Sequence, residues 1–77
     1  MIHEFEKVVL TTDLLSHNLL CGDVGTVVMI HENGKGYEVE FMTLGGETLS
    51  VQTLLANQIR AVGKREIARV RDLEKAA

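Results

Sequence analysis

The run Gly22-Asp23-Val24-Gly25-Thr26-Val27-Val28 constrains the fold of this chain more than any other stretch. Its glycines allow a tight turn, and the β-branched residues that follow favour a strand, so we expect a strand that begins directly after a loop. This combination is typical of small β-barrels. A phosphate-binding loop is not expected, because that motif leads into a helix and carries a lysine.

Short apolar segments separated by turn residues predict five strands in all. They are expected over 5–12, 24–32, 37–42, 47–54 and 59–62. Asn33-Gly34 predicts a hairpin after the second strand, and Gly45-Gly46 predicts the next turn. Residues 55–58 are too few for an α-helix and predict a single 3₁₀ turn. The third strand alternates apolar Tyr37, Val39 and Phe41 with acidic Glu38 and Glu40.

The order of these elements favours one fold class, an all-β, five-stranded SH3-like barrel. A first strand, a long loop, three strands joined by tight turns, a 3₁₀ turn and a short last strand follow one another in that fold. Leucines in the long loop 13–23 are expected to pin it against the barrel. An OB-type barrel is the nearest alternative, but Thr43-Leu44-Gly45-Gly46 leaves no room for the helix that it needs.

The end of the chain has a different composition and predicts a C-terminal α-helix. Residues 64–77 are rich in Lys, Arg, Glu, Ala and Leu, so we divide the chain into a barrel over 1–63 and a helical tail over 64–77. A helix of this length is marginal alone. Its narrow apolar stripe therefore needs cover from its own barrel, a second copy or another protein. The expected interaction residues are the stripe and one flanking arginine: Ile67, Val70, Leu73 and Arg69.

Charge is distributed unevenly along the 77 residues, whose formal net charge is −3. The first 59 residues hold only Lys7 and Lys35 as cations, and the remaining Lys and Arg residues all lie from Arg60 onward. Within the tail, Glu66 is spaced to pair with Arg69. An acidic barrel repels phosphate, which argues against nucleic-acid binding by the sheet. A basic tail helix leaves nucleic-acid binding open as an alternative.

The single cysteine, Cys21, excludes an internal disulfide and agrees with a reducing, cytoplasmic location. No apolar run is long enough to cross a bilayer, so no membrane association is expected. The nearest approach to a set of metal ligands is His17, Cys21, Asp23 and His31. These residues lack a second closely spaced pair, so we expect no metal and no cofactor. Cys21 is expected to be buried, and its use as a nucleophile would need His17 plus a further orienting residue. We therefore expect no enzyme activity.

Residues 13–62 resemble the uncharacterised family named domain of unknown function 4926. The resemblance rests on Asp13, Leu19, the run Gly22 to Val28, Tyr37-Glu38-Val39-Glu40-Phe41, Gly46-Glu47-Thr48 and the Leu-x-x-x-Gln-Ile run ending at Ile59. It implies an SH3-like small barrel and no established activity, and it implies loosely an accessory role beside a partner protein. A weaker likeness to KOW-type barrels rests on the Gly-Asp-x-Gly-x-Val entry alone.

Together these observations predict a non-enzymatic protein-interaction module that self-associates or binds a partner protein through its tail. The alternative is a KOW-like nucleic-acid-binding module that uses the basic C-terminal helix.

Overall fold

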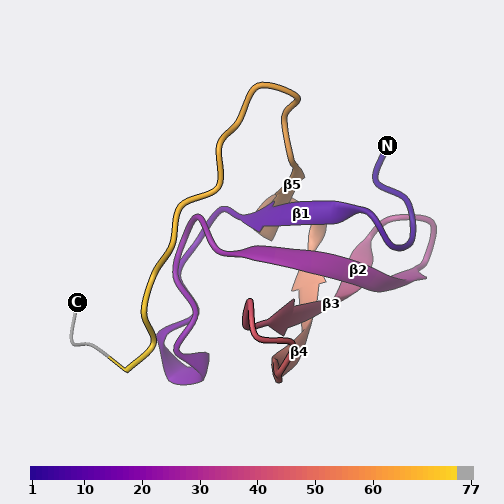
Figure 1. The fold of residues 1–77 in the computed structure, drawn as a ribbon. Coiled ribbons are helices and arrows are strands. Elements are labelled where there is room, and N and C mark those ends of the chain that lie inside the picture. Colours follow the sequence, from indigo (N-terminus) through magenta and orange to yellow (C-terminus); the bar gives the residue numbers. More distant parts are fainter. Residues whose placement is uncertain (75–77) are drawn as a thin grey trace.

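The computed structural model describes residues 1–74 and shows one antiparallel sheet of five strands (Figure 1). The strands are β1 (Lys7–Leu10), β2 (Val24–His31), β3 (Gly36–Met42), β4 (Thr48–Leu55) and β5 (Ile59–Ala61). Two 3₁₀ helices accompany them, η1 (Leu15–His17) and η2 (Ala56–Gln58). The all-β prediction and the approximate positions of all five strands are confirmed, as is the 3₁₀ turn before the last strand.

The sheet has the order β4-β3-β2-β1-β5, which leaves β4 and β5 as its two edges. Within residues 1–74 no ladder joins these edges, so the expected closure into a barrel is not found. The strand that follows β4 through η2 is β5, which has only three residues and pairs with Val8, Val9 and Leu10 of β1. It forms no ladder with β4.

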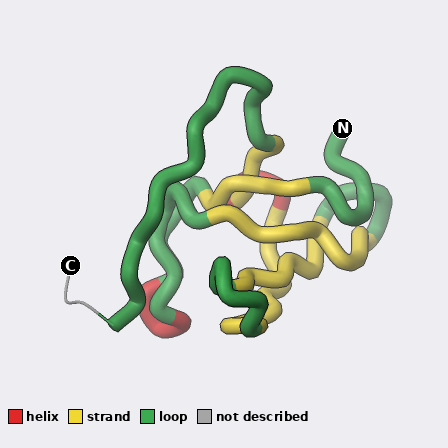
Figure 2. Tube along the Cα trace, viewed as in Figure 1, coloured by secondary structure: helices red, strands yellow, loops and turns green. Residues whose placement is uncertain are grey.

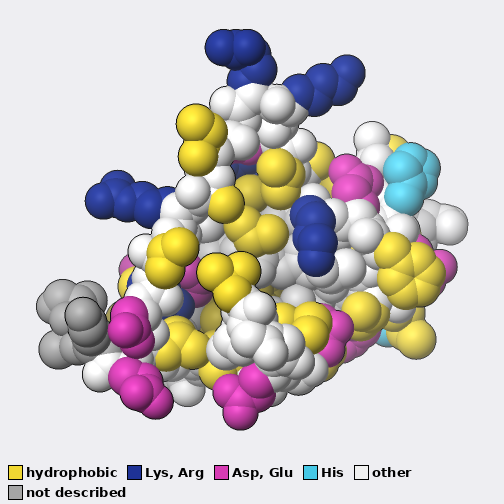
Figure 3. Space-filling model, viewed as in Figure 1, with side chains coloured by type: hydrophobic (Ala, Val, Ile, Leu, Met, Phe, Trp, Pro, Cys, Tyr) yellow, Lys and Arg dark blue, Asp and Glu magenta, His cyan; other side chains and the backbone are white. Residues whose placement is uncertain are grey.

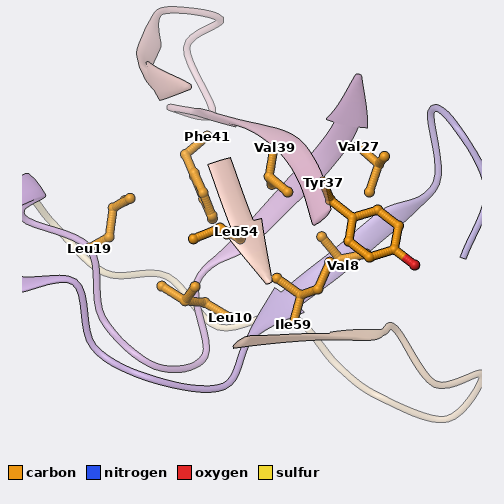
Figure 4. Close-up of a cluster of buried hydrophobic side chains, with 9 residues drawn as sticks. All are labelled: Val8, Leu10, Leu19, Val27, Tyr37, Val39, Phe41, Leu54 and Ile59. Atoms are coloured by element: carbon orange, nitrogen blue, oxygen red, sulfur yellow. The ribbon is translucent and has the colours of Figure 1, made fainter. Parts of the chain in front are cut away.

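The core is a cluster of nine apolar side chains that all the strands and the long first loop contribute (Figure 4). Its members are Val8, Leu10, Leu19, Val27, Tyr37, Val39, Phe41, Leu54 and Ile59. The alternation in β3 is confirmed, because Tyr37, Val39 and Phe41 are all buried. Leu19 is also buried, so the loop between β1 and β2 is pinned as expected.

The two glycines at the start of β2 have different roles. Gly22 has a φ of +98° and makes the turn, as expected. Gly25 lies inside β2, where a Cβ atom would stand 2.5 Å from Val39 Cγ1 and 3.0 Å from the Glu40 carbonyl oxygen. Gly25 therefore permits close packing of β2 on β3 rather than a sharp turn.

The predicted C-terminal helix is wrong: residues Val62–Glu74 contain no helix and run back along the protein as an irregular segment (Figure 2). We call this segment the tail. Glu66 pairs with Arg60 and not with Arg69, and Arg71 pairs with Asp23. These two attachments hold the tail at separate points of the sheet, and an α-helix advances only about 1.5 Å per residue, which makes it a poor bridge between them. The predicted helix also included residues 75–77, which lie outside the described residues.

Candidate interaction groove

Asp23, which directly precedes β2, organises the entry to that strand. Its Oδ2 accepts a hydrogen bond of 2.8 Å from the backbone N–H of Leu20. The neighbouring N–H of Cys21 donates to Asp13 Oδ1, also at 2.8 Å. Two carboxylates thus satisfy consecutive amides of the loop, which is the local use of aspartate that turn chemistry favours. The bonds leave both oxygens of Asp23 able to accept from a further donor.

Arg71 is that donor, and it attaches the end of the tail. Its Nη2 lies 2.6 Å from Asp23 Oδ2, and its Nε lies 3.2 Å from Asp23 Oδ1. The same Nη2 also donates to the carbonyl oxygen of Asn18 at 3.1 Å. This two-point geometry matches a guanidinium to a carboxylate. Hydrogen bonding to Asp23 raises the pKa of Arg71 above its ordinary value.

Glu66 attaches the beginning of the tail to β5. Arg60 donates from Nη1 to Glu66 Oε1 and from Nη2 to Oε2, both at 2.7 Å. The backbone N–H of Gly63 donates to the same Oε1 at 2.6 Å. The pKa of Glu66 is lowered from 4.5 to about 2, mainly by the hydrogen bonds from Arg60 and to a smaller extent by the one from Gly63. Glu66 is therefore ionised, and its attachment holds, at neutral pH.

Between these two attachments lies an open groove of about 910 Å³, bounded by the tail, the start of β2 and the β3–β4 turn. We call it the tail groove. Most of its lining surface is apolar, and six of its apolar side chains are exposed or half-exposed: Val24, Met42, Leu49, Val62, Ile67 and Val70. Figure 3 shows hydrophobic side chains gathered on this face, with Lys and Arg side chains among and around them and most Asp and Glu side chains along the lower edge.

The structure brings all four predicted interaction residues to this groove, although not on a helix. Ile67, Val70, Leu73 and Arg69 each line it. Ile67 is 94% exposed and Val70 is 79% exposed, whereas Leu73 is half-buried. The tail therefore folds back onto its own sheet through charged side chains, and leaves Ile67 and Val70 uncovered.

Sequence reasoning missed the groove residues that the sheet and its turns contribute. Val24, Met42 and Leu49 belong to strands that were predicted, but their outward direction places them on the groove wall. Leu44 is 92% exposed in the β3–β4 turn. A leucine followed directly by two turn-forming glycines was the one available signal, since a leucine in a turn has no core in which to be buried.

The residues considered as metal ligands or nucleophiles are not assembled into one site. Cys21 is exposed, so the expectation that it is buried is wrong. His31 bonds Glu38 Oε2 at 2.7 Å on the outer face of the β2–β3 hairpin, and His17 lies in η1. Residues 1–74 contain no group of three His, Cys, Asp or Glu side chains that could hold a metal ion. In the same residues, no helix is both long and apolar enough to cross a membrane.

Comparison with known proteins identifies the family. Searches of curated proteins and of solved structures found no match. A family model described as Domain of unknown function (DUF4926) matches residues 4–61, which include all five strands and stop before the tail. That match covers most of the chain, and the resemblance drawn from the Gly22–Val28 and Tyr37–Phe41 motifs is confirmed. The chain belongs to the DUF4926 domain family.

Proposed function

We propose that this chain is a non-enzymatic protein-interaction module that binds an aliphatic segment of a partner protein in the tail groove. The observation that carries the proposal is the continuous apolar surface around the groove, to which Val24, Met42, Ile67 and Val70 contribute exposed side chains. Apolar patches of this kind, rimmed by polar residues, are typical of protein-binding sites. A volume of about 910 Å³ is large enough for several side chains of a bound segment.

The charges along the tail define which partner the groove favours. Lys64 and Arg65 precede Ile67, and neither has a carboxylate within 4.0 Å among residues 1–74. Asp72 and Glu74 follow Val70 and are exposed. A partner segment with acidic residues at one end and basic residues at the other would match this polarity. Such complementarity sets the orientation of a bound segment more than its affinity.

The strand order and the η2 turn before β5 support an SH3-like arrangement of the domain. In this proposal the fold acts as a rigid support for the groove, and catalysis is not part of its role. Hydrogen bonds among residues 1–74 do not join the Cys21 thiol to His17, as a nucleophile and base would require. The free, exposed thiol also suits a reducing cytoplasm.

A phage-displayed library of random peptides, selected on the full chain, tests the proposal. We expect enrichment of peptides that carry aliphatic residues. The double variant Ile67→Asp, Val70→Asp should not bind these peptides. Both side chains are so exposed that we expect the substitutions to leave the fold intact. Phe5→Asp is the matched control, because Phe5 is 74% exposed and lies outside the groove. No enrichment, or equal binding to the double variant, would count against the groove.

Nucleic-acid binding is the second candidate, and the exposed cations Lys64, Arg65 and Arg69 favour it. The helix on which that candidate first rested is not found in residues 62–74, and Glu47, Asp72 and Glu74 line the same groove. Titration with short RNA and DNA at about 50 mM salt decides between the two, since phosphate contacts are strongest at low salt. We expect no binding under these conditions.

A further inference from the structure

Of the features that usually prevent an edge strand from pairing with another chain, β4 has only a β-bulge at Leu49, near its start. Its eight residues, Thr48–Leu55, include no proline and no charged residue. It equals β2 in length and is the longer of the two edges, since β5 has only three residues. Natural sheets protect their edges with short strands, prolines or charges, and β5 follows that rule. The edge at β4 does not.

The outer face of β4 is also largely apolar, although it includes Thr53, whose hydroxyl donates to Glu38 Oε2. Leu49, Val51 and Leu55 are 38%, 50% and 60% exposed, while the inward positions of the same strand hold Ser50 and Gln52 besides buried Leu54. A strand of a stable monomer normally has the reverse arrangement, with polar residues outward. The pattern therefore indicates that this face and edge are covered in the functional state.

The hydrogen bonds of β4 define which backbone groups are free. The N–H of Leu55 donates to Gln58 Oε1 at 2.8 Å and thus points away from β3. Backbone groups alternate in direction along an antiparallel strand, so the N–H and C=O groups of Val51 and Thr53 also point to the open edge. These are the groups that an added strand would bond.

We propose that β4 pairs with β4 of a second copy in antiparallel orientation, joining two sheets into one across a two-fold axis at Gln52. In this register Val51 of each copy faces Thr53 of the other, and each pair exchanges two backbone hydrogen bonds. The bulge residue Leu49 lies outside this paired segment, towards the end at which Leu55 of the other copy stands. The same backbone groups of the two copies bond each other, as an isologous interface requires.

Electrostatics favours a second copy as the occupant. Because β4 has no charged residue, pairing of two β4 strands places no like charges opposite each other. The carboxylates beside it on the outer face, Glu38 and Glu40, belong to β3, and Glu47 precedes β4 outside the paired segment. Across the joined sheet the two β3 strands stand three spacings apart, roughly 14 Å. This exceeds the screening length of about 8 Å at physiological salt, so their repulsion is weak.

The pairing is tested by light scattering on the full chain, measured over a concentration series that reaches the millimolar range. We expect the mass to rise from 8.5 kDa towards twice that value. Val51→Pro removes two of the intermolecular hydrogen bonds while leaving the bonds to β3. It should raise the dissociation constant about tenfold or more, as the loss of two net hydrogen bonds implies. Val51→Thr keeps the N–H and the β-branched shape and is the matched control.

Amide hydrogen exchange measured by NMR keeps the proposal testable if the proline variant does not fold. The N–H groups of Val51 and Thr53 should gain protection as the concentration rises, while those of β5 should not. A chain that stays at 8.5 kDa throughout would overturn the proposal. So would a dimer that Val51→Pro leaves intact but that Ile67→Asp, Val70→Asp abolishes, since that outcome assigns self-association to the tail groove. The peptide selection reports on the groove separately, so either proposal can fail without the other.

Discussion

The guanidinium of Arg71 donates a hydrogen bond to the carboxylate of Asp23, and Nη2 lies 2.6 Å from Oδ2 although 48 positions separate the two residues. Asp23 in turn holds the loop before β2 through the N–H of Leu20. One carboxylate therefore shapes the entry to a central strand and attaches the tail that walls the groove. The position of the tail, and hence the shape of the groove, depends on this contact and on that of Glu66 with Arg60.

Replacing Arg71 with methionine should release the end of the tail and leave the sheet intact. The pair is partly exposed, so the loss in unfolding free energy is expected to be about 1 kcal/mol or less. Heteronuclear NOE values should fall for residues 67–74 and stay unchanged in β1–β4. Arg69→Met is the control, because Arg69 is exposed and has no ion-pair partner among residues 1–74. An ordered tail in R71M would contradict the role of this contact.

The attachment of Glu66 should survive mild acid. Its pKa in the folded protein, about 2, lies below the ordinary 4.5, so the contact favours the ionised form. The stabilisation of the folded state by this contact is fully present above pH 4.5 and is lost as the pH falls through about 2. The amide proton shift of Gly63, which bonds Glu66, follows this titration. The low inflection should vanish in Glu66→Gln, and an inflection near 4.5 in the native chain would show that the carboxylate is not held.

Gly25→Ala should destabilise the sheet because the new methyl group would meet β3. It would lie 2.5 Å from Val39 Cγ1, a distance that forces backbone or side-chain displacement. Overpacking of this kind costs about 1–3 kcal/mol, measurable by urea or thermal unfolding. Gly45→Ala is the control, since its nearest neighbour is Thr43 Oγ1 at 3.7 Å. Equal stability of the two variants would show that β2 does not need the close approach.

The Cys21 thiol should react with a maleimide in the native protein, because Cys21 is exposed, in a small hollow that it lines together with Asp23 and Arg71. The rate without denaturant should be within about tenfold of the rate in urea, as for an accessible thiol of ordinary reactivity. Mass spectrometry after timed quenching measures both rates. A thiol that reacts only after unfolding would restore the original interpretation of Cys21 as a buried hydrophobe.

The sheet could be predicted from local sequence because its signals are local. Asn33-Gly34 has φ values of 58° and 100°, the left-handed turn that this pair favours, and it sets the β2–β3 hairpin. The alternation of Tyr37, Val39 and Phe41 placed the inner face of β3 correctly. Closure into a barrel could not be judged in this way, because it depends on whether the two edge strands, β4 and β5, pair with each other in the folded sheet.

The tail could not be predicted, because its conformation depends on contacts across the whole chain. The composition of residues 64–77 favours a helix, and Glu66 is well spaced for Arg69. In the folded protein Glu66 finds the doubly donating Arg60 and Arg71 finds Asp23, and these contacts replace the local ones. The same folding-back turned separate apolar residues, such as Val24 and Val70, into one groove.

A methyl NMR map of the chain titrated with the strongest selected aliphatic peptide tests the central claim most directly. If the peptide binds in the tail groove, the chemical shifts of the methyl groups of Val24, Leu49 and Val70 should change. The buried methyl groups of Val27 and Val39 should stay unchanged. Changes confined to the face around His31 and Glu38, or no changes in the groove at saturation, would contradict the account.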